Sequence, residues 1–361
     1  MRIAQLANFV GPTSGGLRRA VDKLGQGYVA AGHERLLIVP GPQDGVVETA
    51  AGVIVTVASP AVASGYRIVV NTAKVAQVLN RFQPTSVEVS DKWTMTRAAF
   101  WARRHGVAAI LLSHERLDDQ ASLFLDMSVA GPVHRLNRYL ARHYDRVVVT
   151  TRYSAAEWFD TEAHLVVQGL GVDLDEFIPS RHEPSDKLKL VYAGRLSREK
   201  SPDLAVATAV ELDRRGIDVQ LNVYGTGPML DELRALAEGA PVFFHGYLDS
   251  RARLAAAYSA ADIALSVCPV ETFGLAVLEA LACGTPVVTS DRGGGRESVE
   301  ADCAEWASPD PVFLGDAVLR LAERLRADRP GLRAAARRQA ERFPWSRTID
   351  AMLDLHQAVS R

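Results

Sequence analysis

The sequence has few of the residues that build metal centres, disulfides or membrane spans. Its 361 residues include three cysteines, Cys268, Cys283 and Cys303, at spacings that match no metal-ligand motif and no Cys-x-x-Cys pair. We expect them to be small core residues in a reducing compartment. No stretch reaches the roughly 18 consecutive apolar residues of a membrane-spanning helix. The composition therefore favours a soluble globular protein without a structural metal.

Signals for export, for nucleic acid and for common nucleotides are also missing. The first residues, MRIAQLANF, have no apolar core followed by a small-residue cleavage site, so they predict a strand and a cytosolic protein. The net charge of −2 provides no strongly basic domain for nucleic acid. The segment GPTSGGLRR lacks the Lys-Ser/Thr of a P-loop and the GxGxxG spacing, which disfavours an ATPase or an NAD-dependent dehydrogenase.

What the sequence does contain is a regular alternation of apolar runs and amphipathic segments. Runs such as RIAQLA, RLLIVP and AAILLS alternate with helix-like segments such as GLRRAVDKLGQGYVAAG. This pattern predicts a parallel sheet covered by helices on both faces. It stops at a turn-rich segment, residues 171–187, and then restarts. We therefore predict an α/β protein with two Rossmann-like, doubly wound domains facing a cleft, residues 1–170 and 188–344.

Two glutamates eight residues apart mark an otherwise apolar stretch, ETFGLAVLEALACGTP. Burying a carboxylate without a partner is costly, so Glu271 and Glu279 need a reason. We predict a helix from Phe273 to Gly284, with Glu271 just ahead of it and Glu279 in its second turn. One glutamate would bind a sugar diol and the other a ribose diol; the alternative is that Glu271 only caps the helix. The amides that could bind an anion at this helix start are those of Phe273, Gly274 and Leu275.

Two cations flank a turn at the end of the first strand of the second domain, in YAGRLSREKSPDLAV. Arg195 and Lys200 are placed where a doubly wound sheet binds ligands, and together they could neutralise a diphosphate. The alternative is that either cation is a surface residue. Glycine turns at Gly15 and Gly16, and in YGTGP around Gly225, are weaker signals of the same kind.

The first half of the chain carries the excess of basic residues. Arg135, Arg138 and Arg142 recur at helical spacing in VHRLNRYLARHYDR, after the apolar run SLFLDMSVAG. A basic amphipathic helix can lie on an anionic membrane. A helix with a solvated face is an equally good interpretation.

The motifs together resemble a known family. GRLSREK, YGTGPM, HGYLDSRARLAAAYSAADIALSV and the E-x7-E segment are similar, in order and spacing, to the donor domain of family 4 retaining glycosyltransferases. The likeness extends over essentially the whole chain. GPTSGGLRRAVDKLG, VEVSDKWT and SHERLD resemble the actinobacterial phosphatidylinositol dimannoside mannosyltransferases, which are GDP-mannose-dependent α-1,6 enzymes. The linker departs from the family in lacking a proline before its GVD turn.

The resemblance implies the GT-B fold, with a C-terminal helix at about 345–361 crossing back to an acceptor-binding N-terminal domain. The second domain would bind the nucleotide-sugar donor. The implied catalytic residues are His114, Arg195, Lys200 and Glu271. The implied donor-binding residues are Gly15, Gly16, Gly225, Leu248, Asp249, Phe273, Gly274, Leu275 and Glu279. The implied acceptor-binding residues are Arg18, Asp91, Glu115 and Arg116.

The chemistry follows from the charge that develops when the sugar leaves the diphosphate. Arg195, Lys200 and the helix start would stabilise the leaving phosphate, so we expect neither a metal nor a cofactor. Asp173 and Asp175 imitate a metal-binding DxD motif, but we interpret them as turn formers between the domains. The resemblance implies retention of configuration, with the leaving phosphate assisting deprotonation of the acceptor.

The donor prediction rests on Asp249. A carboxylate can accept from the ring N–H and the exocyclic amine of guanine together, whereas uracil offers one ring N–H, so Asp249 favours GDP-mannose. The alternative is that Asp249 or Ser250 caps the following helix. Rival functions are a UDP-sugar-dependent transferase with a soluble or natural-product acceptor, a nucleotide-sugar 2-epimerase and a non-catalytic binding subunit. A retaining glycosidase is disfavoured because its two carboxylates flank one bond.

Overall fold

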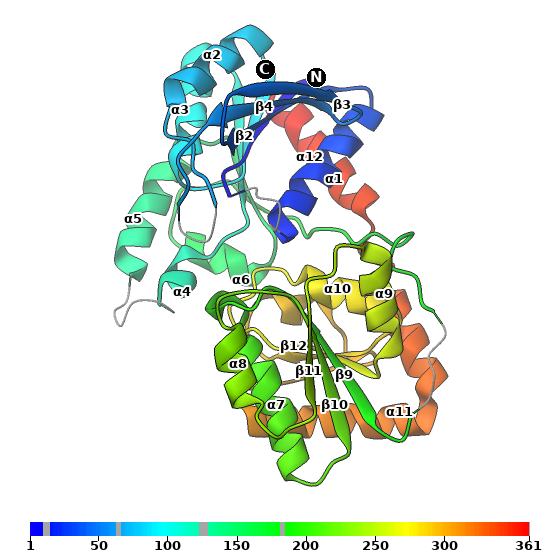
Figure 1. Cartoon of the computed structure of the whole chain (residues 1–361). Helices are drawn as coiled ribbons and strands as arrows, with labels where there is room; N and C mark the ends of the chain where they lie inside the picture. The colour runs from blue at the N-terminus through cyan, green and yellow to red at the C-terminus, as the bar shows by residue number, and fades with distance from the viewer. Residues whose placement is uncertain (10–14, 63–65, 123–128, 181–184, 361) are drawn as a thin grey trace. The chain divides into compact units, whose positions relative to one another are not determined.

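The computed structural model describes residues 1–9, 15–62, 66–122, 129–180 and 185–360. These residues form two compact units (Figure 1). Unit 1 consists of Met1–Leu170 together with Trp345–Arg361, and unit 2 of Gly171–Pro344. Each unit contains one sheet with helices packed on it. Among the described residues, no helix combines the length and apolar character needed to span a bilayer.

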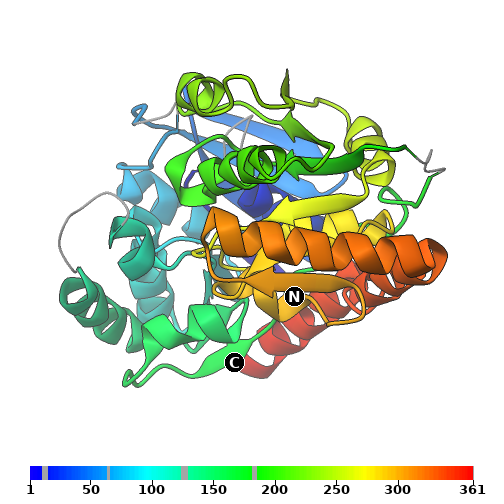
Figure 2. The ribbon, with the colours of Figure 1, turned by 90° about the horizontal axis from the view of Figure 1, so that it is seen from below.

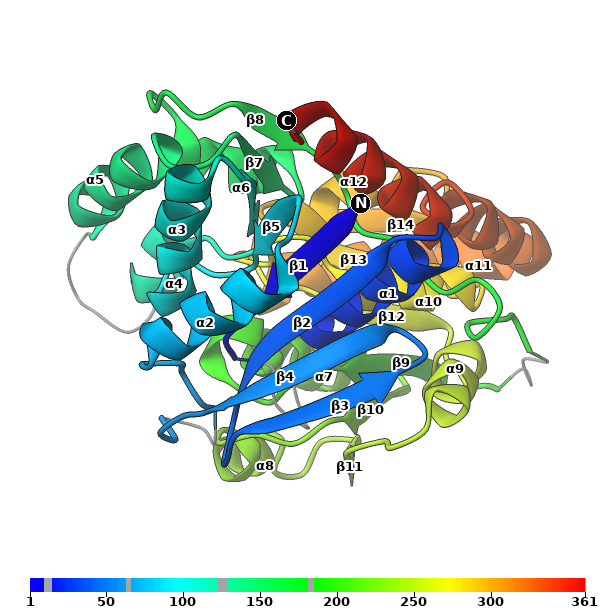
Figure 3. The same ribbon diagram turned by 90° about the horizontal axis from the view of Figure 1, so that it is seen from above.

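The sheet of unit 1 has the strand order β3-β4-β2-β1-β5-β6-β7-β8. Its strands are β1 (Arg2–Leu6), β2 (Glu34–Gly41), β3 (Gly45–Thr49), β4 (Gly52–Ala58), β5 (Ser86–Val89), β6 (Ala108–Ser113), β7 (Arg146–Val149) and β8 (Leu165–Val167). β5 and β6 are buried along their whole length, as expected for strands covered on both faces. Figure 3 shows β3, β4, β2 and β1 side by side.

The helices of unit 1 pack on this sheet. They are α1 (Gly16–Ala30), α2 (Thr72–Phe82), α3 (Arg97–His105), α4 (Leu117–Ser122), α5 (Ala130–Ala141), α6 (Arg152–Ala155) and α12 (Trp345–Val359). The C-terminal helix α12 lies beside α1, as Figure 3 shows. Its Met352 joins an apolar cluster with Ile3, Leu24 and Tyr28. The C-terminal helix therefore completes the core of the first unit.

A buried polar network also attaches α12 to unit 1. The Glu88 carboxylate is inaccessible to solvent and lies 3.1 Å from His356 Nε2. It also accepts hydrogen bonds from Tyr28 Oη at 2.7 Å and Gln5 Nε2 at 2.8 Å. Because three partners surround it, this carboxylate is satisfied inside the core.

The sheet of unit 2 is entirely parallel, in the order β11-β10-β9-β12-β13-β14. Its strands are β9 (Leu188–Ala193), β10 (Val219–Tyr224), β11 (Val242–Gly246), β12 (Ile263–Ser266), β13 (Val287–Ser290) and β14 (Ala304–Ala307). Its helices are α7 (Pro202–Arg214), α8 (Leu230–Leu236), α9 (Arg251–Ala260), α10 (Leu275–Ala282) and α11 (Pro311–Ala340). Figure 2 shows the length of α11, whose buried face packs into the core of the unit.

The prediction of two helix-covered sheets is confirmed, with one departure in strand direction. β3 pairs antiparallel with β4, because only a short turn joins the two strands and no crossover helix intervenes. β3 lies at the edge of the sheet, and its Val46 and Val47 are exposed, so it carries no buried apolar pattern.

Candidate functional site

In unit 2, Lys200 and Glu271 form an ion pair although 71 residues separate them in the sequence. Lys200 Nζ donates to Glu271 Oε2 over 2.8 Å, and the two side chains remain 39% and 18% exposed. Burial alone would raise the pKa of Glu271, but Lys200 and the Phe273 and Thr272 amides hold it below its ordinary value. Burial likewise opposes the Lys200 ammonium, yet Glu271 raises the pKa of Lys200 above its ordinary value. Both groups are therefore charged at neutral pH.

The turn that carries Arg195 and Lys200 is held by hydrogen bonds to its carbonyl groups. The buried hydroxyl of Tyr192 lies 3.3 Å from the carbonyl oxygens of both Arg195 and Lys200. Cys268 Sγ donates to the Glu199 carbonyl oxygen at 3.2 Å. Burial raises the pKa of the Cys268 thiol to about 11, so the thiol keeps the proton that it donates. The two predicted cations thus stand on a fixed turn.

The YGTGP turn after β10 packs against the same segment. Gly225 has a φ of +139°, and a Cβ atom there would lie 1.9 Å from the Gly194 carbonyl oxygen. At Gly227, a Cβ atom would lie 2.2 Å from the Leu196 carbonyl oxygen. The Leu196 N–H also donates to the Thr226 carbonyl oxygen at 3.0 Å. Gly225 therefore has a packing reason to be glycine.

A glycine-rich loop that sequence reasoning missed supports Glu271. The Gly294 N–H donates to the Glu271 carbonyl oxygen at 2.5 Å. Gly293 has a φ of +83°, and a Cβ atom there would lie 2.8 Å from the Pro269 carbonyl oxygen. The available signal was the run of three glycines shortly after β13, which is typical of close backbone approach.

The helix that follows Glu271 begins later than predicted. α10 starts at Leu275, because Gly274 adopts a left-handed φ of +88° and forms the N-cap. The Phe273 amide bonds to the Glu271 carboxylate in this structure, so anion binding by this amide stays a prediction. The first amides of α10 have no acceptor within the helix. Glu279 lies in the second turn, as predicted, and is 5% exposed.

Ser250, not Asp249, caps the helix that follows them, α9. Ser250 is the N-cap of α9 and accepts from the Arg253 N–H. Asp249 is exposed and lies 3.4 Å from Arg253 Nη1, just beyond the carboxyl end of β11. Leu248, beside it, is half-buried. The cap therefore does not account for the Asp249 carboxylate.

In unit 1, the acidic residues predicted for the acceptor follow β5 and β6. The side chain of Asp91 is almost inaccessible; Oδ1 accepts from the Trp93 N–H at 2.7 Å and Oδ2 from the Asn8 N–H at 3.2 Å. Burial nevertheless raises the pKa of Asp91 to about 6.

His114 and Glu115 directly follow β6. His114 Nε2 lies 3.6 Å from Glu115 Oε1, and each side chain is 19% exposed. Burial raises the pKa of Glu115, and Lys92 offsets part of that rise. Glu115 Oε2 accepts no hydrogen bond from the described residues. This carboxylate therefore retains acceptor capacity.

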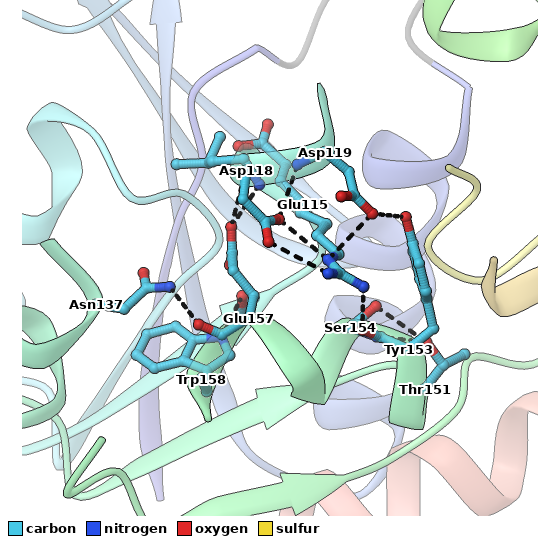
Figure 4. Close-up of polar contacts among 12 residues, drawn as sticks. Glu115, Asp118, Asp119, Asn137, Thr151, Tyr153, Ser154, Glu157 and Trp158 are labelled. Atoms are coloured by element: carbon cyan, nitrogen blue, oxygen red, sulfur yellow. Dashed lines mark hydrogen bonds and ion pairs between the residues drawn. The ribbon is translucent and has the colours of Figure 1, made fainter. Parts of the chain in front are cut away.

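Arg116, predicted to bind the acceptor, is engaged by other residues of unit 1. Its guanidinium lies 3.0 Å from Asp118 and 3.2 Å from Asp119, and it donates to the Tyr153 carbonyl oxygen at 3.1 Å. It also stacks 4.4 Å from the centre of the Tyr153 ring. Figure 4 shows Asp118, Asp119 and Tyr153 gathered here. Arg116 thus fixes this part of the structure.

A fully buried ion pair in unit 1, Lys92–Glu157, was missed by sequence reasoning. Both side chains are 1% exposed, and Lys92 Nζ bonds directly to Glu157 Oε2. Asn137 donates to the Glu157 carbonyl oxygen at 3.1 Å, as Figure 4 shows. No motif links two residues 65 positions apart, so no local signal in the sequence could have revealed the pair.

The glycines predicted near the phosphate begin α1. Gly15 is the N-cap and Gly16 the first helical residue, and both are exposed. Arg18, predicted to bind the acceptor, lies 3.7 Å from Asp22 on the exposed face of α1. The preceding part of the GPTSGG motif lies outside the described residues.

The predicted interpretation of the cysteines agrees with the structure. Cys268, Cys283 and Cys303 are buried and form no disulfide. Among the described residues, no three His, Cys, Asp or Glu side chains are grouped so that they could hold a metal ion.

Comparison with known proteins identifies the family. Residues 15–160 match the family described as "Glycosyl transferase 4-like domain", and residues 173–331 match "Glycosyl transferases group 1". The chain is 40% identical, over 98% of its length and 95% of the relative's, to the GDP-mannose-dependent alpha-(1-6)-phosphatidylinositol dimannoside mannosyltransferase of Mycobacterium tuberculosis. The chain belongs to the family 4 glycosyltransferases.

This glycosyltransferase has further relatives. It is 33% identical to the D-inositol 3-phosphate glycosyltransferase of Saccharomonospora viridis, over 74% of this chain and 69% of that protein. Its fold resembles sucrose-phosphate synthase from Thermosynechococcus elongatus, with a TM-score of 0.80, 20% identity and coverage of 99% and 98% of the two chains. It also resembles Anabaena HepE in complex with UDP and glucose, with a TM-score of 0.76, 16% identity and 98% coverage of both. The glycosyltransferase has the GT-B fold.

Proposed function

We propose that this glycosyltransferase moves mannose from GDP-mannose to a phosphatidylinositol mannoside. The observation that carries the proposal is the 40% identity, over 98% of the chain, to a mycobacterial mannosyltransferase named for that donor and acceptor. Because the alignment covers both units, it includes the residues assigned to donor and acceptor alike. Unit 2 would bind the donor, and unit 1 the acceptor.

In this proposal, Lys200 and Arg195 hold the diphosphate of the donor. Their turn is fixed by Tyr192 and Cys268, so little reorganisation is needed as negative charge develops on the leaving phosphate. The start of α10 would add partial positive charge near the same group. These groups supply the neutralisation that a divalent metal supplies elsewhere, and we therefore propose a metal-independent reaction.

The remaining assignments follow the sugar. Glu271, kept ionised by Lys200, would accept hydrogen bonds from hydroxyls of the transferred mannose, and Glu279 would bind the ribose hydroxyls. His114 would face the sugar from unit 1. The reaction would retain the anomeric configuration, with an oxygen of the leaving phosphate accepting the proton of the acceptor hydroxyl.

The donor and acceptor are tested together by product analysis. Purified enzyme is offered GDP-mannose or UDP-glucose, with phosphatidylinositol dimannoside, a soluble mannoside or no acceptor, and products are analysed by mass spectrometry and NMR. We expect an α-1,6-linked mannosyl product only with GDP-mannose and the lipid acceptor. Transfer from UDP-glucose to the soluble acceptor would support the rival transferase. Donor turnover to an epimer without any acceptor would support a 2-epimerase.

The base preference is tested at Asp249. Calorimetric titration of Asp249→Asn should give weaker GDP binding with UDP binding almost unchanged, because guanine offers two adjacent donors to a carboxylate. Ser250→Ala is the control, since it removes the cap of α9 but no base contact. Tighter binding of UDP than of GDP by the unmodified protein would overturn the donor assignment.

We also propose a peripheral location on the cytoplasmic face of the plasma membrane. Arg135, Arg138 and Arg142 are exposed on and just after α5, although Arg142 also lies 3.3 Å from Glu162. Attraction to anionic lipid is worth about 1 kcal/mol per basic residue near the surface. The adjacent apolar run SLFLDM lies largely outside the described residues.

Co-sedimentation with lipid vesicles tests this location. At low salt, the protein should bind vesicles that contain phosphatidylglycerol more strongly than vesicles of phosphatidylcholine alone, and Arg135→Glu/Arg138→Glu should remove the difference. Equal binding to both vesicles would refute the proposal.

A further inference from the structure

The Lys92–Glu157 pair is buried more deeply than either charge could be alone. Each side chain is 1% exposed, and Lys92 Nζ also lies 5.0 Å from the centre of the Trp158 ring. Removing two charges from water costs several kcal/mol per ion, and well-packed apolar residues are often as stable in their place. Stability alone is therefore a poor account of the pair.

The pair differs from an isolated ion pair because both of its side chains also bond to the backbone of a neighbouring segment. Glu157 Oε1 accepts from the Leu117 N–H at 2.5 Å and from the Asp118 N–H at 3.3 Å. Lys92 Nζ lies 3.4 Å from the Glu115 carbonyl oxygen. The two side chains thus hydrogen-bond to the backbone on both sides of Arg116. Figure 4 shows Glu157 lying between Glu115 and Asp118 on one side and Trp158 on the other.

This segment, His114–Asp118, contains His114, which we assign to the transferred sugar, and Glu115, which we assign to the acceptor. The ionisable groups that act on the Glu115 carboxylate are Asp91 and Lys92 after β5, Glu157 before Trp158, and the neighbouring His114. Asp118, on the same segment, acts on Lys92. Lys92 favours the ionised form of Glu115, whereas Glu157 disfavours it. Burial is the main cause of the raised pKa of Glu115, and the two charges of the pair act on it in opposite directions. The pair therefore holds the backbone that carries this carboxylate and also influences its pKa.

We propose that Lys92 and Glu157 are positioning residues that hold the His114–Asp118 segment in place for binding the acceptor sugar. This inference rests on the proposed function, because it takes the segment to face the sugar acceptor. Both residues belong to unit 1, so loss of the pair should spare nucleotide binding by unit 2.

The test compares Lys92→Met, Glu157→Gln and the double variant with the unmodified enzyme. Acceptor kcat/KM is measured from pH 5 to 9, a range set by the titration of acids and His, and GDP binding by calorimetry. The Glu115 carboxyl is titrated by carbon-13 NMR, with its resonance assigned from Glu115→Gln. Leu79→Ala is the control, because Leu79 is an apolar residue of α2 that is buried in the core of unit 1.

We expect each single variant to lose roughly 100-fold in acceptor kcat/KM, the cost of misplacing a group by about 1 Å. GDP binding should be unchanged. The pKa of Glu115 should rise in Lys92→Met and fall in Glu157→Gln. The acidic side of the pH profile of kcat/KM should therefore move to higher pH in Lys92→Met and to lower pH in Glu157→Gln. The double variant should regain stability and an intermediate pKa but not activity, because the contact to the Glu115 carbonyl is still missing. Leu79→Ala should lower the melting temperature without moving the pKa.

Opposite pKa shifts cannot come from general destabilisation. The inference would be overturned if both variants shifted the Glu115 pKa in the same direction or not at all, or if their loss of kcat/KM matched that of Leu79→Ala. An unmodified enzyme that makes no mannoside product would refute the proposed function instead. In that case the NMR titration still decides whether the pair influences the pKa of Glu115.

Discussion

The ammonium group of Lys200 is the one that we assign to the leaving phosphate. We predict that Lys200→Ala lowers kcat roughly 100- to 1000-fold, the usual cost of one lost oxyanion donor, with kcat/KM falling in parallel. Circular dichroism should report an intact fold. Lys187→Ala is the matched control, because Lys187 forms an exposed pair with Asp218 in the same unit. Near-normal turnover by a folded Lys200→Ala enzyme would remove the assignment.

Asp91 should make the stability of the protein depend on pH. Its pKa rises from an ordinary 3.8 to about 6 in the fold, so the folded state holds a proton that the unfolded chain has released. The contribution of Asp91 to the free energy of unfolding is complete below about pH 4 and is lost as the pH rises through about 6. At about 1.4 kcal/mol per pKa unit, it amounts to roughly 3 kcal/mol. Urea unfolding of the normal protein and Asp91→Asn should diverge over that window; parallel pH profiles would contradict the assignment.

The turn between β9 and α7 provides a prediction at the scale of one element. Tyr192→Phe removes the hydroxyl shared by the Arg195 and Lys200 carbonyls, and should cost about 1 kcal/mol of stability. GDP affinity should fall by a factor of about 5 as the turn loosens. Tyr144→Phe is the control, because the buried Tyr144 hydroxyl has no hydrogen-bond partner among the described residues. Equal nucleotide binding by both variants would show that the turn does not depend on Tyr192.

The contact between this turn and the YGTGP turn can be separated from backbone strain. Gly225→Ala and Gly239→Ala both place a side chain at a positive φ, which costs about 1–2 kcal/mol. Only at Gly225 would the Cβ atom also meet a carbonyl oxygen; at Gly239 nothing lies within 4 Å. We predict that Gly225→Ala unfolds at clearly lower urea concentration than Gly239→Ala and binds GDP more weakly. Equal losses would mean that strain, not collision, makes Gly225 a glycine.

Helices and strands could be predicted from the sequence where apolar residues recur in regular runs along the chain. The runs RLLIVP and AAILLS form strands. The assignment of Lys200 to the donor comes from the family resemblance and stays a prediction. β3 and the three-residue β8 were not predicted, because an exposed edge strand and a very short one carry little periodic signal. The start of α10 was misplaced because the left-handed Gly274 comes before it. The Lys92–Glu157 pair depends on tertiary packing, which periodicity does not encode.

Across the whole of unit 1, the link between Glu88 and His356 should govern how firmly the C-terminal helix is held. We predict that His356→Phe costs about 1.5–3 kcal/mol, because a buried carboxylate loses a hydrogen-bond partner. Hydrogen exchange should then show faster opening of α12 than of the rest of unit 1. Ser360→Ala, which alters only a backbone contact at the same end, is the control. Unchanged exchange in α12 would indicate that apolar packing alone holds it.

The position of α12 also fixes the order in which the chain can fold as it is synthesised. Residues 171–344 leave the ribosome complete, with all the strands of their own sheet, and can fold at once. The first unit emerges earlier, but its cluster of Ile3, Leu24 and Tyr28 waits for Met352. Until Trp345–Val359 has been synthesised, that apolar surface stays open to chaperones and proteases. Of the two units, the one that begins first is therefore the one whose core is completed last.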